Sequence, residues 1–134
     1  MHFKIKKDMS NFIFDAEMQM SKGKLKAHLD LYSFLENNIH IIYCPSLDMS
    51  GYGESEEDAQ KSFEEVFTSS VKYMVNKSSL HDDLKKHGWN VRGKKSHDLK
   101  SPKFADMYKA NKDFKDIIDN KPYQKIYKDL CIPA

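Results

Sequence analysis

The sequence predicts an α+β fold: an antiparallel sheet of three to five strands, one long helix packed on one face, and a short helical C-terminal extension. Two observations carry this prediction. Between residues 11 and 54, short segments with strand character alternate with turn residues, and such short links favour an antiparallel meander. From Ser55 onward the apolar residues recur at helical spacing instead. A chain of 134 residues is long enough to form one core of its own.

The first two strands alternate between apolar and polar positions. In residues 11–20 every second side chain is apolar, with Ile13 as the exception, and residues 25–35 repeat the alternation. A period of two is typical of a strand that is buried on one face. Residues 21–24 and 36–38 are turn segments, since glycine and asparagine tolerate left-handed backbone angles.

The next two strands lie on either side of a proline. Residues 39–44 are more continuously apolar, as expected of a central strand, and Pro45 ends them because proline has no N–H for a sheet ladder. Residues 48–54 form a fourth, short strand. Within it, Gly51 and Gly53 indicate either a bulge or a close approach of the backbone to a neighbouring element.

The long helix is expected from Ser55 to about Asn76. Ser55 and Asp58 have the spacing of a capping box, and the first turn is acidic, which suits the helix dipole. Apolar residues at three- and four-residue spacing form one stripe, which is expected to pack on the sheet. The stripe comprises Ala59, Phe63, Val66, Phe67, Val71, Met74 and Val75.

The chain after this helix is less regular. A second short helix is expected between Ser79 and Gly88, and residues 89–91 are expected to close the sheet as a strand. Residues 92–103 form a basic, polar linker, and a helical pattern follows it. Residues 123–132 fit either a terminal strand or an extended arm. One helix covers only one sheet face, so the C-terminal helices or a second subunit are expected to cover the other.

One stretch combines several features in an unusual order: a strand that ends in proline, a Gly-x-Gly pair, a helix cap and an acidic first turn. Its residues are Tyr43-Cys44-Pro45, Leu47-Asp48, Ser50-Gly51-Tyr52-Gly53, Ser55-Glu56-Glu57 and Ala59. This stretch resembles the core of HicB-like antitoxins, which are small β-β-β-α-β domains from bacterial and archaeal toxin–antitoxin operons. The resemblance covers roughly residues 24–91.

The resemblance divides the chain into four parts. These are an N-terminal strand and turn (1–23), a HicB-like core (24–91), the basic linker (92–103) and a C-terminal helical extension (104–134). HicB antitoxins usually carry a C-terminal DNA-binding domain, whereas the extension here matches neither a helix-turn-helix nor a ribbon-helix-helix. The resemblance therefore implies a solo member that lacks the DNA-binding domain.

Charge bears on two hypotheses for function. The net charge is +2, but residues 92–134 carry +5 and residues 1–91 carry −3. The resemblance implies a non-catalytic binding module that docks a small, basic, toxin-like protein through its sheet or helix, as HicB neutralises the HicA ribonuclease. The acidic residues 1–91 would complement such a partner. The alternative is a nucleic-acid-binding protein that contacts phosphates through the basic linker and the extension.

Each hypothesis assigns its own candidate residues. The first assigns partner binding to the motif and to the tryptophan after Gly88: Tyr43, Pro45, Asp48, Gly51, Tyr52, Gly53 and Trp89. For Trp89, packing in the core or at its rim is the other interpretation. The second hypothesis assigns phosphate contacts to Arg92, Lys94 and Lys95. A solvated linker is the other interpretation there, because no aromatic residues are interleaved with the charges.

No catalytic, cofactor or metal site is expected. The acidic residues near Asp48 form no carboxylate set spread over several strands, and the six histidines lack paired metal-ligand spacing. Cys44 and Cys131 form no C-x-x-C pair and are expected to be reduced, buried thiols of a cytoplasmic protein. No apolar run is long enough to span a membrane.

A homodimer is expected, because HicB-like domains commonly oligomerise.

Overall fold

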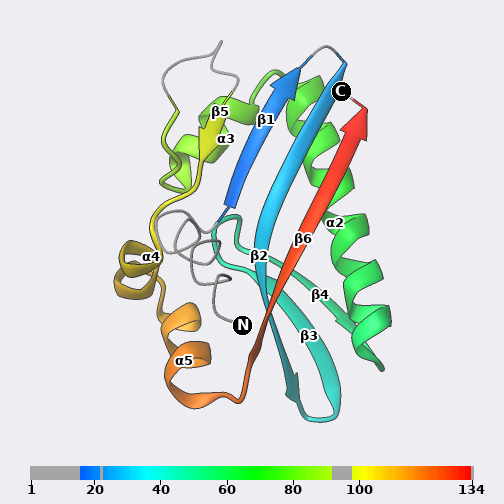
Figure 1. The fold of residues 1–134 in the computed structure, drawn as a ribbon, viewed down its shortest axis with the longest axis vertical. Helices are drawn as coiled ribbons and strands as arrows, with labels where there is room; N and C mark the ends of the chain where they lie inside the picture. Colours follow the sequence, from blue (N-terminus) through cyan, green and yellow to red (C-terminus); the bar gives the residue numbers. More distant parts are fainter. Residues whose placement is uncertain (1–15, 22, 92–97, 134) are drawn as a thin grey trace, which may run out of the picture.

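The computed structural model describes residues 16–21, 23–91 and 98–133. They form a six-stranded antiparallel sheet with the long helix α2 beside it and two short helices, α4 and α5, at the other side (Figure 1). The predicted α+β class is confirmed. In chain order the elements are β1 (Ala16–Ser21), β2 (Lys24–Glu36), β3 (Ile39–Cys44), β4 (Met49–Gly53), α2 (Glu56–Asn76), α3 (Leu80–Lys86), β5 (Asp98–Lys100), α4 (Phe104–Ala110), α5 (Lys112–Asn120) and β6 (Gln124–Pro133).

Strand β2 organises the sheet. β6 pairs with β2 from Lys24 to Ser33, whereas β1 pairs with residues 24–29 and β3 with residues 32–36. Because a strand has only two edges, β1 and β3 share the edge that β6 does not occupy, one after the other. β4 and β5 extend the sheet beyond β3 and β1. The sheet therefore has one strand more than the sequence predicted.

The strand that closes the sheet is not the predicted one. Residues 89–91 form no strand, and Asn90 makes only a single bridge to Lys100. The closing strand is β5, which pairs with β1 and lies inside the segment that was predicted as a linker. The reason is that the side chain of Trp89 is buried in the main core, so this segment lies against the core instead of running along a strand.

The remaining differences concern the two ends of the chain. Residues 123–132 left two interpretations open, and the structure forms β6 from Gln124–Pro133. The first predicted strand covered residues 11–20; β1 begins at Ala16, and residues 11–15 lie outside the described residues.

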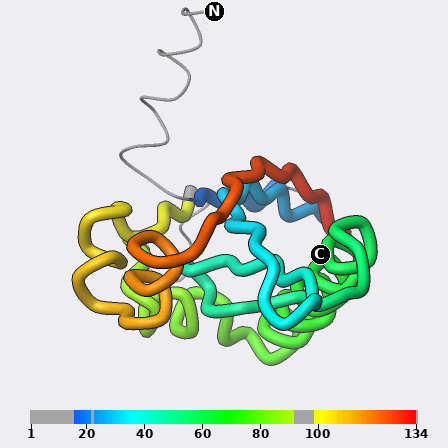
Figure 2. The backbone as a smooth tube through the Cα atoms, turned by 90° about the horizontal axis from the view of Figure 1, so that it is seen from below, coloured from blue at the N-terminus to red at the C-terminus, as the bar shows by residue number. Residues whose placement is uncertain are grey.

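The two faces of β2 point into different cores. Leu25, Leu29 and Leu31 lie in the core beneath α2. Tyr32 and Phe34 point to the opposite face and pack in a second core that α4 and α5 complete with Met107, Phe114 and Ile117. Figure 2 shows α2 and the α4–α5 pair on opposite sides of the molecule. The expectation that C-terminal helices cover the second sheet face is met at this end of the sheet.

Helix α2 lies in direct backbone contact with β4. A Cβ atom at Gly51 would lie 2.3 Å from the backbone nitrogen of Phe63, and a Cβ atom at Gly53 would lie 2.5 Å from that of Ala59. The β3–β4 register runs without interruption, so β4 contains no bulge. Of the two interpretations for these glycines, the close backbone approach is therefore correct.

The start of α2 agrees with the prediction from the sequence, and its buried apolar stripe agrees with one exception. The hydroxyl of Ser55 accepts a hydrogen bond from the backbone N–H of Asp58 at 3.1 Å, which confirms the predicted cap. Phe63 and Phe67 are completely buried. Val66 is 38% exposed, so its predicted place on the buried stripe is wrong. The buried positions recur every four residues, and Val66 falls beside that narrow line.

Candidate partner-binding groove

The turn between β3 and β4 carries two of the predicted site residues, Pro45 and Asp48. Pro45 is buried directly after the end of β3, as expected of a residue that stops a strand. Asp48 is exposed and has a φ of 54°, a left-handed conformation that aspartate tolerates better than most residues. Trp89 supports the turn from inside, because its Nε1–H donates to the carbonyl oxygen of Ser46 at 2.8 Å. Trp89 is only 3% exposed and so takes the packing role.

Tyr43 links this turn to the C-terminal helices. Its hydroxyl donates to Oδ1 of Asp48 at 2.8 Å and accepts from Nδ2 of Asn111 at 2.8 Å. The Oδ1 atom of Asn111 accepts from the backbone N–H of Phe114 at 3.0 Å and thereby caps α5. Burial raises the pKa of Tyr43, so its hydroxyl keeps the proton that it donates. The motif turn and the start of α5 are held together as one unit.

A surface groove of about 740 Å³ opens between these two segments and is called the Asp48 groove below. One wall is the β3–β4 turn, a second is the end of α3, and the third is the α4–α5 pair with Pro102 before it. The charged or titratable side chains that line it are Asp48, His87, Asp106, Lys112 and Asp113. Three carboxylates against one ammonium group give the groove a negative potential that favours cationic side chains.

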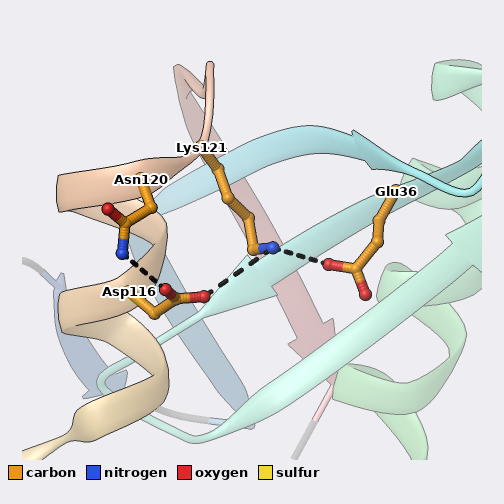
Figure 3. A network of polar contacts seen from close by, with 4 residues as sticks. All are labelled: Glu36, Asp116, Asn120 and Lys121. Atoms are coloured by element: carbon orange, nitrogen blue, oxygen red, sulfur yellow. Dashed lines mark hydrogen bonds and ion pairs between the residues drawn. The ribbon is translucent and has the colours of Figure 1, made fainter.

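The α4–α5 wall is also fixed to the sheet at its far end. Figure 3 shows Lys121 between the two carboxylates of Glu36 and Asp116, at 2.7 Å and 3.7 Å, while Asn120 donates to Asp116. The hydrogen bond to Glu36 raises the pKa of Lys121, which therefore remains charged at neutral pH. Asn111 and Lys121 hold α5 at its two ends, and Phe114 is buried between them.

The other motif residues lie away from the groove. Gly51 and Gly53 face α2 and have the packing role described above. Tyr52 points to the sheet face away from α2, where it lies directly across from Ile41 of β3, and the residue is 58% exposed. Its backbone N–H donates to the hydroxyl of Ser62 on α2 at 3.2 Å. The structure thus places Pro45 and Asp48 in the lining of the groove, with Tyr43 hydrogen-bonded to Asp48, and places the rest of the motif elsewhere.

The candidates for phosphate binding, Arg92, Lys94 and Lys95, lie outside the described residues. Several lysines of the C-terminal part are paired with carboxylates. Lys128 pairs with Glu64 at 2.7 Å, Lys115 with Asp119 at 3.4 Å, and Lys100 with Glu17. Lys121 and Lys125 also form ion pairs. Five of the eight lysines in residues 98–133 are therefore compensated within the fold.

The sheet face opposite α2 also carries titratable groups that the sequence did not reveal. His28 on β2 and Asp129 on β6 are 101 residues apart in the chain, and Nδ1 of His28 lies 2.5 Å from Oδ1 of Asp129. Cys131 lines the same hollow of about 300 Å³ and is exposed, so its predicted burial is wrong; Cys44 is buried as predicted. The side chain of Asp129 is 82% exposed, so water screens this pair strongly.

Within the described ranges, no three histidine, cysteine, aspartate or glutamate side chains are grouped closely enough to hold a metal ion. Over the same part of the chain, no helix combines the length and apolar character that are needed to cross a lipid bilayer.

Comparisons with family models, with curated proteins and with solved structures find no match to this chain.

The sequence missed the second half of the groove. Asp106, Asn111 and Asp113 come from a segment that was predicted only as a helical extension. A signal was present for Asn111, because asparagine three residues before Phe114 is a favoured helix N-cap. No local signal shows that this cap lies against Tyr43, which is 68 residues away.

Replacing Tyr43 by phenylalanine tests the link between the turn and α5. We expect the free energy of unfolding to fall by about 1 kcal/mol, because the variant loses both hydrogen bonds of a half-buried hydroxyl. Tyr52→Phe is the matched control, since this side chain is largely exposed, and its effect should stay within about 0.5 kcal/mol. Urea unfolding of both variants measures the difference. Equal effects would contradict a structural role for the Tyr43 hydroxyl.

Proposed function

We propose that this protein is a non-catalytic binding module that docks a small, basic partner protein in the Asp48 groove. The observation that carries the proposal is the groove itself: three aspartates converge on one hollow from the motif turn and from the α4–α5 pair. Such a site suits a lysine or arginine side chain that projects from a partner surface.

The hydrogen bonds and ion pairs that hold the walls of the groove favour binding of one specific partner over non-specific attraction of cations. Asp48 accepts a hydrogen bond from Tyr43, and α5 is held at both ends by Asn111 and Lys121. A preorganised site loses less conformational entropy on binding than a set of mobile side chains does. The aspartates are thus presented on a firm wall, as expected of a surface that selects one partner.

The resemblance of Tyr43–Ala59 to HicB-like antitoxins indicates the kind of partner. Within that proposal the partner is a small, toxin-like protein with a basic surface. The proposal ranks above nucleic-acid binding because the Asp48 groove is acidic and because five lysines of the C-terminal part form ion pairs with carboxylates. A surface for phosphate would need cations that are not already compensated.

Binding of a short arginine-rich peptide tests the groove directly by titration calorimetry at physiological salt. The groove variant carries Asp48→Asn, Asp106→Asn and Asp113→Asn, which remove three charges while asparagine keeps an acceptor for Tyr43. We expect its affinity for the peptide to fall at least about tenfold, because the cationic side chains lose their counter-charges. If a short, basic reading frame neighbours the gene, co-expression with it followed by pull-down tests the natural partner with the same variant.

The matched control removes three charges elsewhere, through Glu54→Gln, Glu57→Gln and Glu65→Gln. These side chains are exposed along or just before α2, so the net charge changes equally. We expect less than about a twofold change in affinity for the peptide, since these charges are remote and screened. Equal losses in both triple variants would refute the groove. Tighter binding of a DNA duplex than of the peptide would favour the nucleic-acid alternative.

A further inference from the structure

Strand β6 is a long edge strand. All ten of its residues pair with β2 in one uninterrupted register, from Gln124 opposite Ser33 to Pro133 opposite Lys24. No strand in the described part of the chain pairs with its other edge. The unpaired N–H and C=O groups of such an edge form a template for another strand. β6 has no bulge, and its one proline is its last residue, so of the common protections it carries only charged side chains, which are Lys125, Lys128 and Asp129.

The two other edges of the sheet are short, and one is covered. β5 has three residues, and its Lys100 also makes a bridge to Asn90. β4 has five residues, and the backbone N–H of Tyr52 is bonded to the Ser62 hydroxyl of α2. Native edges are commonly blunted in such ways, by shortness or by a covering element. Among the described edges, β6 is therefore the one suited to strand addition.

We propose that β6 pairs with β6 of a second copy of this chain, antiparallel, about a two-fold axis through Tyr127. The two six-stranded sheets then join into one. The charges on the face opposite α2 support this register. Lys125 and Asp129 lie two residues before and after Tyr127, so each lysine lies opposite the aspartate of the other copy. Within its own copy, Nζ of Lys125 also pairs with the buried Asp30 at 3.3 Å, so its ammonium group would be shared between the two carboxylates. Asp129 is 82% exposed and can accept this contact beside its contact with His28.

Neighbouring registers are less favourable. Directly facing residues of an antiparallel pair lie on the same face of the sheet, and side chains alternate between the faces along each strand. A two-fold axis normal to the sheet must therefore place one residue opposite its own copy, and it cannot fall between two consecutive residues. An axis through Lys128 or through Asp129 would place two like charges directly opposite each other, which is destabilising. An axis through Lys125 would do the same. An axis through Ile126 would bring no lysine opposite a carboxylate, so the charge complementarity of the Tyr127 register would be lost. The axis through Tyr127 instead places two tyrosines opposite each other, a favourable cross-strand pair.

Sedimentation equilibrium of the full chain tests the proposal with a pair of charge-reversal variants. We expect the wild type to dimerise. Asp129→Lys should raise the dissociation constant of the dimer at least about tenfold, because each Lys125 would then face a lysine of the second copy. Glu65→Lys makes the same change in charge on the exposed side of α2 and should alter it less than about twofold. Circular dichroism checks that both variants are folded.

Disulfide trapping tests the register. In a Cys131→Ser background, Tyr127→Cys should form a covalent dimer on mild oxidation, because directly facing residues have Cα atoms within disulfide range. Gln124→Cys should not, since its copies lie at opposite ends of the paired strands. A wild type that stays monomeric at about 100 µM, beyond the range of most specific dimers, would overturn the proposal. A dimer that Asp129→Lys leaves intact, or one that Gln124→Cys traps, would also overturn it.

Discussion

Replacing Gly51 by alanine is expected to lower the free energy of unfolding by about 3 kcal/mol or more, the upper end of the range for overpacked sites. The added Cβ atom would lie 2.3 Å from the nitrogen of Phe63 and 2.5 Å from the carbonyl oxygen of Ala59. Both neighbours are backbone atoms of α2, so no side chain can rotate away. The whole helix would have to lift from β4, and its buried face would lose packing contacts.

Ser50→Ala provides the control for this result. Ser50 is the neighbouring residue on the same strand and points to the other face, so its replacement should change stability by less than about 0.5 kcal/mol. Urea or thermal unfolding of the two variants gives the comparison. A loss below about 1 kcal/mol in Gly51→Ala would mean that α2 shifts without cost and that the Gly-x-Gly pair is not a packing requirement.

Replacing Phe67 by alanine is expected to cost roughly 3–5 kcal/mol, as for other buried aromatic residues. Phe67 is completely buried, and its ring stacks against that of Phe63 with the centroids 6.2 Å apart. The truncated side chain would leave a cavity between α2 and the sheet that the neighbouring leucines of β2 cannot fill without moving the strand.

The adjacent residue gives a sharp comparison. Val66 is 38% exposed, so Val66→Ala should cost less than about 1 kcal/mol although it also removes apolar atoms from the same helix. Chemical denaturation of both variants measures the difference in the free energy of unfolding. Similar losses in both would contradict the orientation of α2 described above.

Elements whose signals are local could be predicted from the sequence. The β2–β3 hairpin turns at Asn37 and Asn38, which have φ values of 52° and 66°, and asparagine is well suited to these angles. The cap at Ser55 and the end of β3 before Pro45 likewise depend on one or two residues. Steric and hydrogen-bonding preferences of single residues decide such features, so a short window of sequence contains them.

The last strand could not be predicted for a specific reason. On the face of β6 toward α2, Ile126 and Leu130 are interrupted by Lys128, which breaks the expected alternation of apolar and polar residues. The structure explains the lysine by its ion pair with Glu64 of α2 at 2.7 Å. The partner lies 64 residues away in the chain, so no neighbouring residue indicates that this position faces the helix.

The second wall of the Asp48 groove was hidden in the same way. Tyr43 and Asp48 were predicted as binding residues from their place in the motif, whereas Asn111 and Asp113 lie in a segment with only a helical pattern. Their meeting depends on the packing of Phe114 against Tyr32, whose ring centroids are 5.0 Å apart. Tertiary packing of this kind is the part of a site that sequence patterns do not contain.

The arrangement of β6 has a consequence for the order of folding. β2 can form its hairpins with β1 and β3 early, because these partners are close in sequence. Closing the β2–β6 ladder instead joins residues such as His28 and Asp129, which are 101 positions apart. The loss of chain entropy on closing so long a loop is large, so this ladder is expected to form late. Until then the whole outer edge of β2 remains open to pairing with other chains.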